Sequence, residues 1–380
     1  MEIFLHIGPP KTGSTSIQYG LHLNRAALNE QGVYLPYAGR TARRYAAQQN
    51  LCWELRQNDL FRRRCGTWAD LQVELNRLNR FQKVILSSEH FSSLKSDQVL
   101  FIKDQLANHR VWVVLYLRRQ DKLLQSTWME MIKNPISKFT TDFPSFLRDY
   151  TEFHRRMDYN HIISNWSAVF GEDRLILRHM EKISADQHLL HDFLEACQVS
   201  NYQDFSLPDV LNPSLGPKTI KALRDFKLLL NRKEDAPLRK FIFLCLMDYA
   251  QNSAWNDIHL NLVDENLFNE IASRYESTNC AIAQKFFGTH DLFREPFKPQ
   301  TLTPLADFDL NEEDWLNLMT STPLSLLVNP HQREQILNMP NAHSRVHDFC
   351  EICRKTPVLM IDALYLLSKA KERLTKINNP

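Results

Sequence analysis

Four short runs of aliphatic and aromatic residues, each followed by a stretch with helical spacing, constrain the fold of this 380-residue chain more than any other feature. The runs are Ile3–Ile7, Lys83–Ser88, Val111–Leu117 and Arg174–Arg178. Short apolar runs that alternate with helices are typical of parallel strands joined by right-handed crossovers. We therefore predict an α/β fold with a parallel sheet flanked by helices. In such sheets, ligands bind where strands end and helices begin.

The pattern changes after about residue 180, where only helical spacing continues. The expected helices lie near residues 186–197, 216–231, 236–251 and 263–286. A proline-containing stretch at 295–304 is typical of a linker, and one clear helix follows at 357–376, with Pro357 in its first turn. We expect a domain at 1–290 (sheet core 1–180, helical part 181–290), a linker at 291–310 and a helical C-terminal extension at 311–380.

The composition bears on the class of protein and on its location. The chain has 46 Lys and Arg against 44 Asp and Glu, which favours neither a nucleic-acid partner nor an acidic solvating protein. No apolar run approaches the roughly 20 residues that span a bilayer, and the first residues lack the pattern of a secretory signal. Seven cysteines without a disulfide-framework spacing favour reduced thiols. We therefore expect a cytoplasmic protein with no membrane span, of unknown oligomeric state.

The first apolar run leads directly into a loop of glycine, proline and hydroxyl residues. The loop reads Gly8-Pro9-Pro10-Lys11-Thr12-Gly13-Ser14-Thr15-Ser16, and helical spacing follows from Ile17 to Leu28. Backbone N–H groups and the positive dipole end of a helix N-terminus bind phosphate groups. The strand, loop and helix thus indicate a P-loop-type fold and a phosphorylated ligand. The alternative is a helix start capped by serine or threonine without a ligand.

One position separates this loop from that of nucleoside-triphosphate-binding proteins. Gly8 and Gly13 have the spacing of G-x-x-x-x-G-K-[ST], but Ser14 stands where that motif has its lysine. Lys11 lies inside the loop instead, where it can contact the atom that bridges a single 5′-phosphate to its leaving partner. This placement argues against an ATPase or a kinase.

A second candidate for phosphate binding follows the strand that ends at Leu117. Arg118 stands at the strand end, and Ser126 comes eight residues later in the helix that follows. Both side chains can donate hydrogen bonds to a phosphate. The alternative is an arginine in a solvated ion pair at a helix start.

The segment from Pro10 to Thr15 resembles the 5′-phosphosulfate loop of the sulfotransferases that use 3′-phosphoadenosine 5′-phosphosulfate (PAPS). Arg118 and Ser126 resemble the 3′-phosphate motif of the same family. Many members have a proline two residues after the arginine and a second arginine five residues after it, where this chain has Gln120 and Leu123. The departure leaves the phosphate one cation short unless Arg119 or a later loop compensates.

Further similarity is diffuse but ordered along the chain, and it is to bacterial relatives of the carbohydrate sulfotransferases. It covers roughly residues 1–290. The similar stretches are Leu86–Phe91, Asp158-Tyr159 with Trp166 and Phe170-Gly171, Arg174–Glu181 and Asn212–Leu215.

The resemblance implies transfer of a sulfuryl group from PAPS to an acceptor hydroxyl or amine, with a saccharide favoured and adenosine 3′,5′-bisphosphate as product. It implies cofactor contacts from Pro10, Lys11, Thr12, Gly13, Ser14, Thr15, Ser16, Arg118 and Ser126. Lys11 would stabilise the leaving oxygen without a metal, and Glu89, with His90 as runner-up, would be the base that takes the acceptor's proton. The alternatives are a nucleotide kinase or NTPase-like protein, and a catalytically inactive protein that binds PAPS or the bisphosphate.

Three other groups of residues have less specific interpretations. A cluster of arginines can hold an anionic acceptor or form a solvated face, and it comprises Arg40, Arg43, Arg44, Arg56, Arg62, Arg63 and Arg64. His343, His347, Cys350 and Cys353 have the spacing of one helix face, but four ligands from one helix rarely close a tetrahedron, so we expect no metal. His6 is interpreted as a core or second-layer histidine rather than a catalyst.

Overall fold

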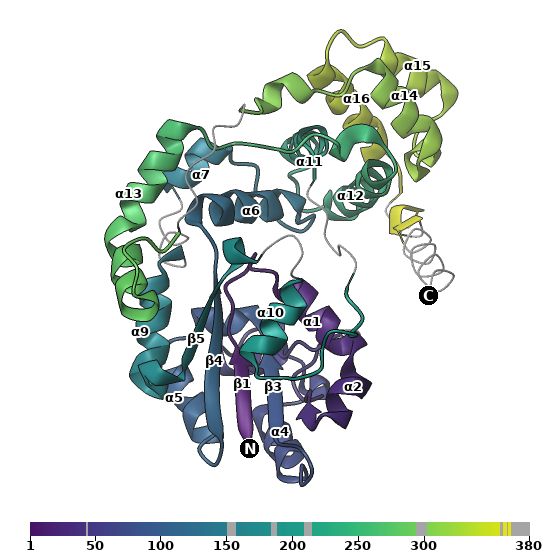
Figure 1. The fold of residues 1–380 in the computed structure, drawn as a ribbon. Coiled ribbons are helices and arrows are strands. Elements are labelled where there is room, and N and C mark those ends of the chain that lie inside the picture. Colours follow the sequence, from purple (N-terminus) through teal and green to yellow (C-terminus); the bar gives the residue numbers. More distant parts are fainter. Residues whose placement is uncertain are drawn as a thin grey trace. The chain divides into compact units, whose positions relative to one another are not determined.

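The structure, a computed structural model, describes residues 1–42, 45–149, 157–183, 188–208, 215–293, 302–357, 360–362 and 364–365 (Figure 1). The chain divides into two compact units. The first comprises residues 1–124, 150–212 and 266–297, and the second comprises 125–149, 213–265 and 298–380. These units do not follow the boundaries at 290 and 311 that we expect from the sequence.

The first unit is built on a sheet of five parallel strands (Figure 1). The strands are β1 (Glu2–His6), β2 (Val33–Tyr34), β3 (Lys83–Ser87), β4 (Arg110–Leu117) and β5 (Leu175–His179), in the order β2-β3-β1-β4-β5. The central strand β1 pairs with β3 and β4, so Leu5 lies opposite both Leu86 and Val113. The predicted parallel sheet flanked by helices is confirmed, and β2 is an additional strand of two residues.

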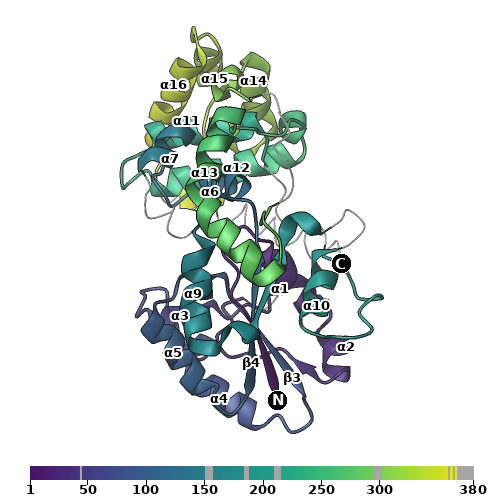
Figure 2. The same ribbon diagram turned by 60° about the vertical axis from the view of Figure 1, so that its left-hand side comes forward.

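Helices cover both faces of this sheet (Figure 2). They are α1 (Ser14–Leu23), α2 (Arg25–Glu30), α3 (Gln49–Leu55), α4 (Trp68–Asn76), α5 (Ser96–Gln105), α9 (Tyr159–Phe170) and α10 (Leu189–Ala196). Helix α13 (Glu265–Ile282) lies beside α9. On one face Phe4 and Tyr116 pack with residues of α1 and α10, including Phe193. All three side chains are fully buried, and each contributes about 1.5–3 kcal/mol by its removal from water. This core holds the loop between β1 and α1 on a rigid base.

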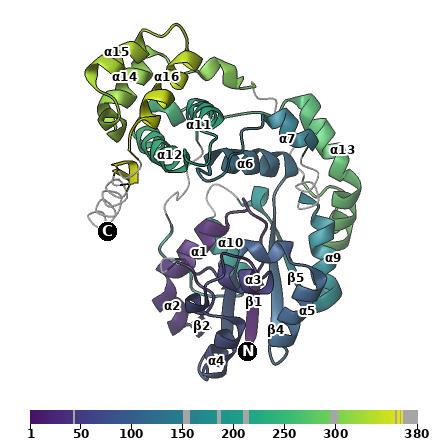
Figure 3. The same cartoon turned by 180° about the vertical axis from the view of Figure 1, so that it is seen from behind.

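The second unit is helical (Figure 3). Its helices are α7 (Phe143–Asp149), α11 (Pro217–Leu229), α12 (Ala236–Gln251), α14 (Glu312–Ser321), α15 (Pro330–Leu337) and α16 (Ala342–Arg354), and α6 (Gln120–Lys133) enters it from the first unit. Phe226 of α11, Trp315 of α14 and Phe349 of α16 form an aromatic cluster, with ring centroids 5.6–5.9 Å apart. This shared core explains why the C-terminal residues cluster with residues 213–265 instead of forming a separate extension.

Two of the expected helices have different bounds in the structure, and one lies mostly outside the described residues. The expected helix at 17–28 is two helices, because the chain turns at Asn24, whose side chain donates to the carbonyls of Gly20 and Ser206. The helix expected at 263–286 ends at Ile282 and continues as a π-helical turn, Ala283–Phe287. Most of the helix expected at 357–376, as well as Asn212–Ser214, Arg43 and Arg44, lies outside the described residues.

The histidines and cysteines of α16 do not share one environment. His343 and His347 are exposed, whereas Cys350 and Cys353 are buried and burial raises the pKa of both thiols. Among the residues that the structure describes, no group of three or more His, Cys, Asp and Glu side chains is arranged to hold a metal ion. Within the same residues, we find no helix of the length and apolar character needed to cross a membrane.

Candidate functional site

The loop between β1 and α1 has a tightly constrained backbone. Gly13 precedes the first residue of α1 with a φ of 77°, and Lys11 has a φ of 68°, which is unusual for a residue with a side chain. Inside the loop, the buried Thr12 hydroxyl donates to the carbonyl of Pro9 at 2.7 Å. A left-handed conformation costs a residue other than glycine, such as Lys11, about 1–3 kcal/mol, and such residues occur preferentially at functional sites. The loop thus presents the first N–H groups of α1 at the carboxyl edge of the sheet, as the sequence predicts.

Gly13 provides a test of this loop geometry. A Cβ atom at Gly13 would lie 2.1 Å from Cδ2 of Leu189, in addition to the strain of its positive φ. We expect Gly13→Ala to lower the free energy of unfolding by about 2–4 kcal/mol, measured by urea denaturation. Gly288→Ala is the matched control, because Gly288 has a φ of 62° but no atom within 4 Å of the added Cβ. If both variants lose the same stability, the contact with Leu189 is not what constrains the loop.

Arg118 joins the end of β4 to this loop. Its Nη1 donates to the carbonyl oxygen of Lys11 at 2.7 Å. Its backbone is held by Tyr159, whose hydroxyl accepts from the Arg118 N–H at 2.9 Å and donates to the Arg118 carbonyl at 2.7 Å. Burial lowers the pKa of Arg118, and the nearby Glu181 opposes that shift, so the guanidinium stays charged at neutral pH. The structure therefore brings two of the predicted site residues, Arg118 and Lys11, together.

The residues after Arg118 explain how this chain departs from the family motif. Arg119 is paired with Asp121 through Nε to Oδ1 at 2.7 Å and Nη2 to Oδ2 at 2.9 Å, and it lies over the ring of Phe268. Gln120 exchanges two hydrogen bonds with Asn279 of α13, and Leu123 is fully buried. Arg119 is thus already held by a carboxylate and is a poor substitute for the missing second arginine.

Ser126 lies half-buried in the second turn of α6, within the second unit. Its role in binding a 3′-phosphate stays a prediction.

Glu89 and His90 follow β3 at the carboxyl edge of the sheet, where β3 neighbours β1. They begin a short 3₁₀ helix, Glu89–Ser93, whose N-cap Ser88 accepts a hydrogen bond from the His90 N–H at 3.2 Å. The His90 ring packs on Trp53 with centroids 5.9 Å apart, and burial, then the charge of Arg56, lowers its pKa. His90 is therefore neutral at pH 7, while Glu89 is half-buried. The choice between them as the base stays a prediction.

A buried polar cluster that was not predicted from the sequence adjoins the loop between β1 and α1. His6, the last residue of β1, lies opposite Ser87 in β3, and its Nδ1 is 2.8 Å from the Ser87 hydroxyl oxygen. Gln18 of α1 donates to the same oxygen at 3.1 Å, and Gln48 accepts from the Ser87 N–H at 2.8 Å. The available signal was the presence of polar residues at the ends of two otherwise apolar strands, which is costly unless they are paired.

The predicted arginine cluster divides into two kinds of side chain. Arg62, Arg63 and Arg64 are exposed, which is the solvated face that the sequence allowed. Arg56 instead donates to the carbonyl of His90 at 2.9 Å and stabilises the turn that contains Glu89.

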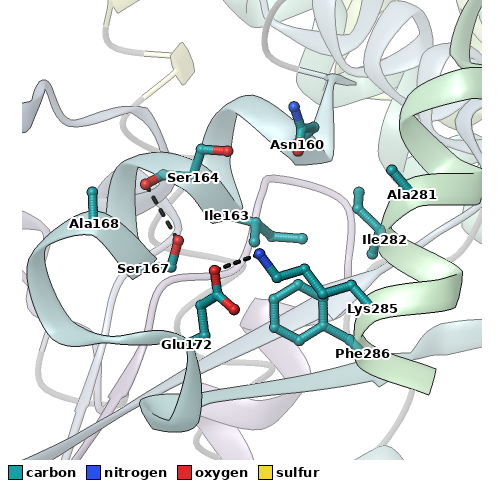
Figure 4. A pocket seen from close by; sticks show the side chains of 10 residues that line it. All are labelled: Asn160, Ile163, Ser164, Ser167, Ala168, Glu172, Ala281, Ile282, Lys285 and Phe286. Carbon is teal, nitrogen blue, oxygen red and sulfur yellow. Dashed lines mark hydrogen bonds and ion pairs between the residues drawn. The ribbon is translucent and has the colours of Figure 1, made fainter. Parts of the chain in front are cut away.

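Two cavities of the first unit have no residue of the loop between β1 and α1 among the residues that line them. One, of about 410 Å³, lies between α9 and the end of α13 and is lined by Ile163, Ser164 and Phe286, with the ion pair of Glu172 and Lys285 at its side (Figure 4). Glu172 precedes β5, so this cavity adjoins the amino end of that strand and not the carboxyl edge. The other, of about 360 Å³, is lined by Arg119, Asp121 and the α13 residue Phe268. Arg119 is the residue that follows Arg118 in the sequence.

Comparison with known proteins gives similarity but no family. No family model matches the chain. An uncharacterised protein of Archaeoglobus fulgidus is 24% identical over 211 residues, so the match spans 55% of this chain and about half (55%) of the length of that curated relative. The crystal structure of a sulfotransferase from Alicyclobacillus acidocaldarius is 14% identical with a TM-score of 0.35, and the match covers 59% of this chain and 91% of that one. A likeness this low does not decide a function, which depends on the site itself.

Proposed function

We propose that this chain transfers a sulfuryl group from PAPS to an acceptor hydroxyl or amine. The observation that carries the proposal is the 2.7 Å hydrogen bond from Arg118 Nη1 to the Lys11 carbonyl. This bond holds the guanidinium at the end of β4 against the loop that follows β1, which supports the proposal that both bind phosphates of one nucleotide. A nucleotide with a phosphate at each of its 5′ and 3′ positions requires such a pair, whereas ATP carries all its phosphates at the 5′ position and has none at the 3′ position for Arg118.

The loop residues fit the 5′ end of such a nucleotide. The Ser14 hydroxyl is buried and has no hydrogen-bond partner among the described residues, so it can donate to a ligand oxygen. Gly8 leaves room for the loop, because an added Cβ would lie 3.1 Å from Thr12 Oγ1 and 3.2 Å from Ser14 Oγ. The N–H groups at the start of α1 add the donors and the dipole that favour a phosphate.

Each proposed residue has a defined task. PAPS supplies the sulfuryl group, and its bisphosphate leaves. The Lys11 ammonium stabilises the negative charge that develops on the leaving oxygen, and residues Thr12 to Ser16 with Pro10 hold the 5′-phosphate. Arg118 and Ser126 hold the 3′-phosphate. Glu89, with His90 as the alternative, removes the acceptor's proton. Alignment of the two reactants supplies the remaining acceleration.

Two further parts of the proposal concern the acceptor and the location of the protein. The resemblance to carbohydrate sulfotransferases favours a saccharide acceptor. All seven cysteines are free thiols, which fits a reducing compartment such as the cytoplasm.

Incubation with sulfur-labelled PAPS and a panel of saccharides, phenols and amines, in the presence of EDTA, tests the proposed function. We expect label on one acceptor class and release of adenosine 3′,5′-bisphosphate. In a parallel incubation with ATP and Mg²⁺ and without EDTA, hydrolysis of ATP by a protein that transfers nothing from PAPS would support the nucleotide kinase or NTPase alternative. Tight binding of PAPS without turnover would support the inactive alternative.

The 3′-phosphate should dominate ligand selection. We expect adenosine 3′,5′-bisphosphate to bind about 10- to 100-fold tighter than AMP in calorimetry, because a hydrogen bond between charged groups contributes about 1.5–3 kcal/mol. Arg118→Gln should remove most of that ratio. Arg110→Gln, at the exposed opposite end of the same strand, should keep it. Equal affinities for AMP and the bisphosphate in the wild type would contradict the role of Arg118.

A further inference from the structure

The polar cluster that adjoins the loop has two buried atoms without partners. His6 Nε2 and Ser14 Oγ make no hydrogen bond within the described part of the chain, although His6 is fully buried and Ser14 is 3% exposed. Both atoms face Gly8, since a Cβ at Gly8 would lie 2.8 Å from His6 Nε2 and 3.2 Å from Ser14 Oγ. A buried polar atom without a partner costs about 1–3 kcal/mol. Two such atoms near Gly8, one at the end of β1 and one at the start of α1, call for an explanation by function.

The hydrogen bonds behind His6 determine which of its nitrogens carries the proton. Burial lowers the pKa of His6 to about 3, so the ring is neutral and has one donor and one acceptor nitrogen. The Gln18 amide nitrogen can only donate, and it donates to Ser87 Oγ at 3.1 Å. His6 Nδ1, at 2.8 Å, is the acceptor for the single Ser87 hydrogen among the described contacts of that hydroxyl, and a proton on Nδ1 would leave this hydrogen without an acceptor. This arrangement favours the tautomer with the proton on Nε2, the nitrogen that faces Gly8.

Two hydroxyl groups lie near Gly8, those of Thr12 and Ser14. Of these two, the Ser14 hydroxyl is the one that can accept a hydrogen bond from His6 and donate its own hydrogen to a ligand. The Thr12 hydroxyl hydrogen is committed to the Pro9 carbonyl at 2.7 Å. Ser14 Oγ has both its hydrogen and its lone pairs available within the described residues. A hydroxyl that accepts one hydrogen bond becomes a stronger donor in the next, by about 10–30% per bond.

We propose that Gln18, Ser87, His6 and Ser14 form a directed hydrogen-bond relay that ends on the 5′-phosphate of the bound nucleotide. The proposal rests on the proposed function. In the structure Gln18 donates to Ser87, whose hydroxyl lies against His6 Nδ1. The relay is completed when the nucleotide binds: His6 Nε2–H, which makes no hydrogen bond among the described residues, then donates to Ser14 Oγ, and the Ser14 hydroxyl donates to a phosphate oxygen. His6 is thus a positioning residue that holds and polarises Ser14, and it does not touch the ligand. Gly8 is required because any side chain there would separate His6 from Ser14.

The tautomer of His6 is the first test. In ¹⁵N-histidine-labelled protein, with the His6 signals identified by their loss in His6→Gln, we expect a protonated Nε2 and a pyridine-like Nδ1. Ser87→Ala should change the ratio of the two His6 tautomers, because it removes the hydroxyl that donates to Nδ1. A His6 with its proton on Nδ1 in the wild type would overturn the relay.

A double-mutant cycle on bisphosphate affinity is the second test. We expect Ser87→Ala to weaken binding of adenosine 3′,5′-bisphosphate about tenfold, the ordinary effect of one lost buried hydrogen bond. Ser14→Ala should weaken it at least as much, and the double variant should bind no worse than Ser14→Ala alone, because Ser87 acts through Ser14. A structural role for Ser87 predicts additive losses instead.

Ser88→Ala is the matched control. Ser88 is as deeply buried as Ser87, but its hydroxyl contacts Cys52 Sγ and the His90 N–H and takes no part in the relay. The Ser88→Ala variant should therefore bind the bisphosphate as tightly as the wild type. Additive losses, or unchanged affinity in Ser87→Ala, would overturn the relay while leaving the proposed function intact. A wild type that binds no bisphosphate would overturn both the relay and the proposed function. The tautomer measurement would then report only on the hydrogen bonds between His6, Ser87 and Gln18.

Discussion

Replacing Lys11 by alanine should lower the rate of sulfuryl transfer by about 10²–10³, the usual loss when one preorganised donor to a developing negative charge is removed. Lys11 is the lysine of the loop, and the loop holds it with a φ of 68°. Its carbonyl accepts a hydrogen bond from Arg118, so the side chain starts from a defined point beside the proposed phosphate site. The charge that it stabilises is larger in the transition state than in the bound substrate. The loss should therefore fall on kcat more than on the affinity for the bisphosphate.

The measurement is the initial rate at saturating PAPS and acceptor. Lys103→Ala is the matched control, because Lys103 is an exposed lysine of α5 that donates to the carbonyl of Val169 at 2.7 Å and belongs to no part of the proposed site. EDTA should leave the wild-type rate unchanged, since Lys11 takes the place that a metal ion has in many phosphoryl-transfer enzymes. A wild type that loses its activity in EDTA, or a Lys11→Ala variant as fast as the control, would contradict this mechanism.

The apolar runs predicted the sheet well because burial on both faces leaves a clear pattern in the sequence. The four expected strands match β1, β3, β4 and β5 to within two residues at each end. Strand β2 was missed because two residues, Val33 and Tyr34, are too few to show any periodicity. The division into units was missed for a different reason. The cluster of Phe226, Trp315 and Phe349 joins residues that are far apart in the chain, and apolar helix faces do not specify their partners.

In the candidate site, too, the features formed by neighbouring residues could be predicted from the sequence, whereas the contacts between distant residues could not. The loop from Pro10 to Ser16 is contiguous and was recognised from its residue types. The contact between Arg118 and Lys11 spans 107 positions, and that between His6 and Ser87 spans 81. Such contacts follow from the pairing of parallel strands, whose carboxyl ends meet at one edge. The sequence could therefore indicate the edge where these residues gather, but not which nitrogen of His6 faces the loop.

The base is the remaining assignment, and Glu89→Gln should lower the transfer rate by about 10²–10⁴ if Glu89 takes the acceptor's proton. The 3₁₀ turn that begins at Glu89 is held by the Ser88 cap and by the bond from Arg56 to the His90 carbonyl, both of which glutamine leaves intact. Bisphosphate affinity should therefore change little, because Glu89 is proposed to contact the acceptor and not the phosphates. Asp97→Asn, an exposed acid in the first turn of α5, is the control. If Glu89→Gln binds the bisphosphate and keeps most of its turnover, Glu89 is not the base. His90→Ala should then show the loss, because its ring is neutral and able to accept a proton.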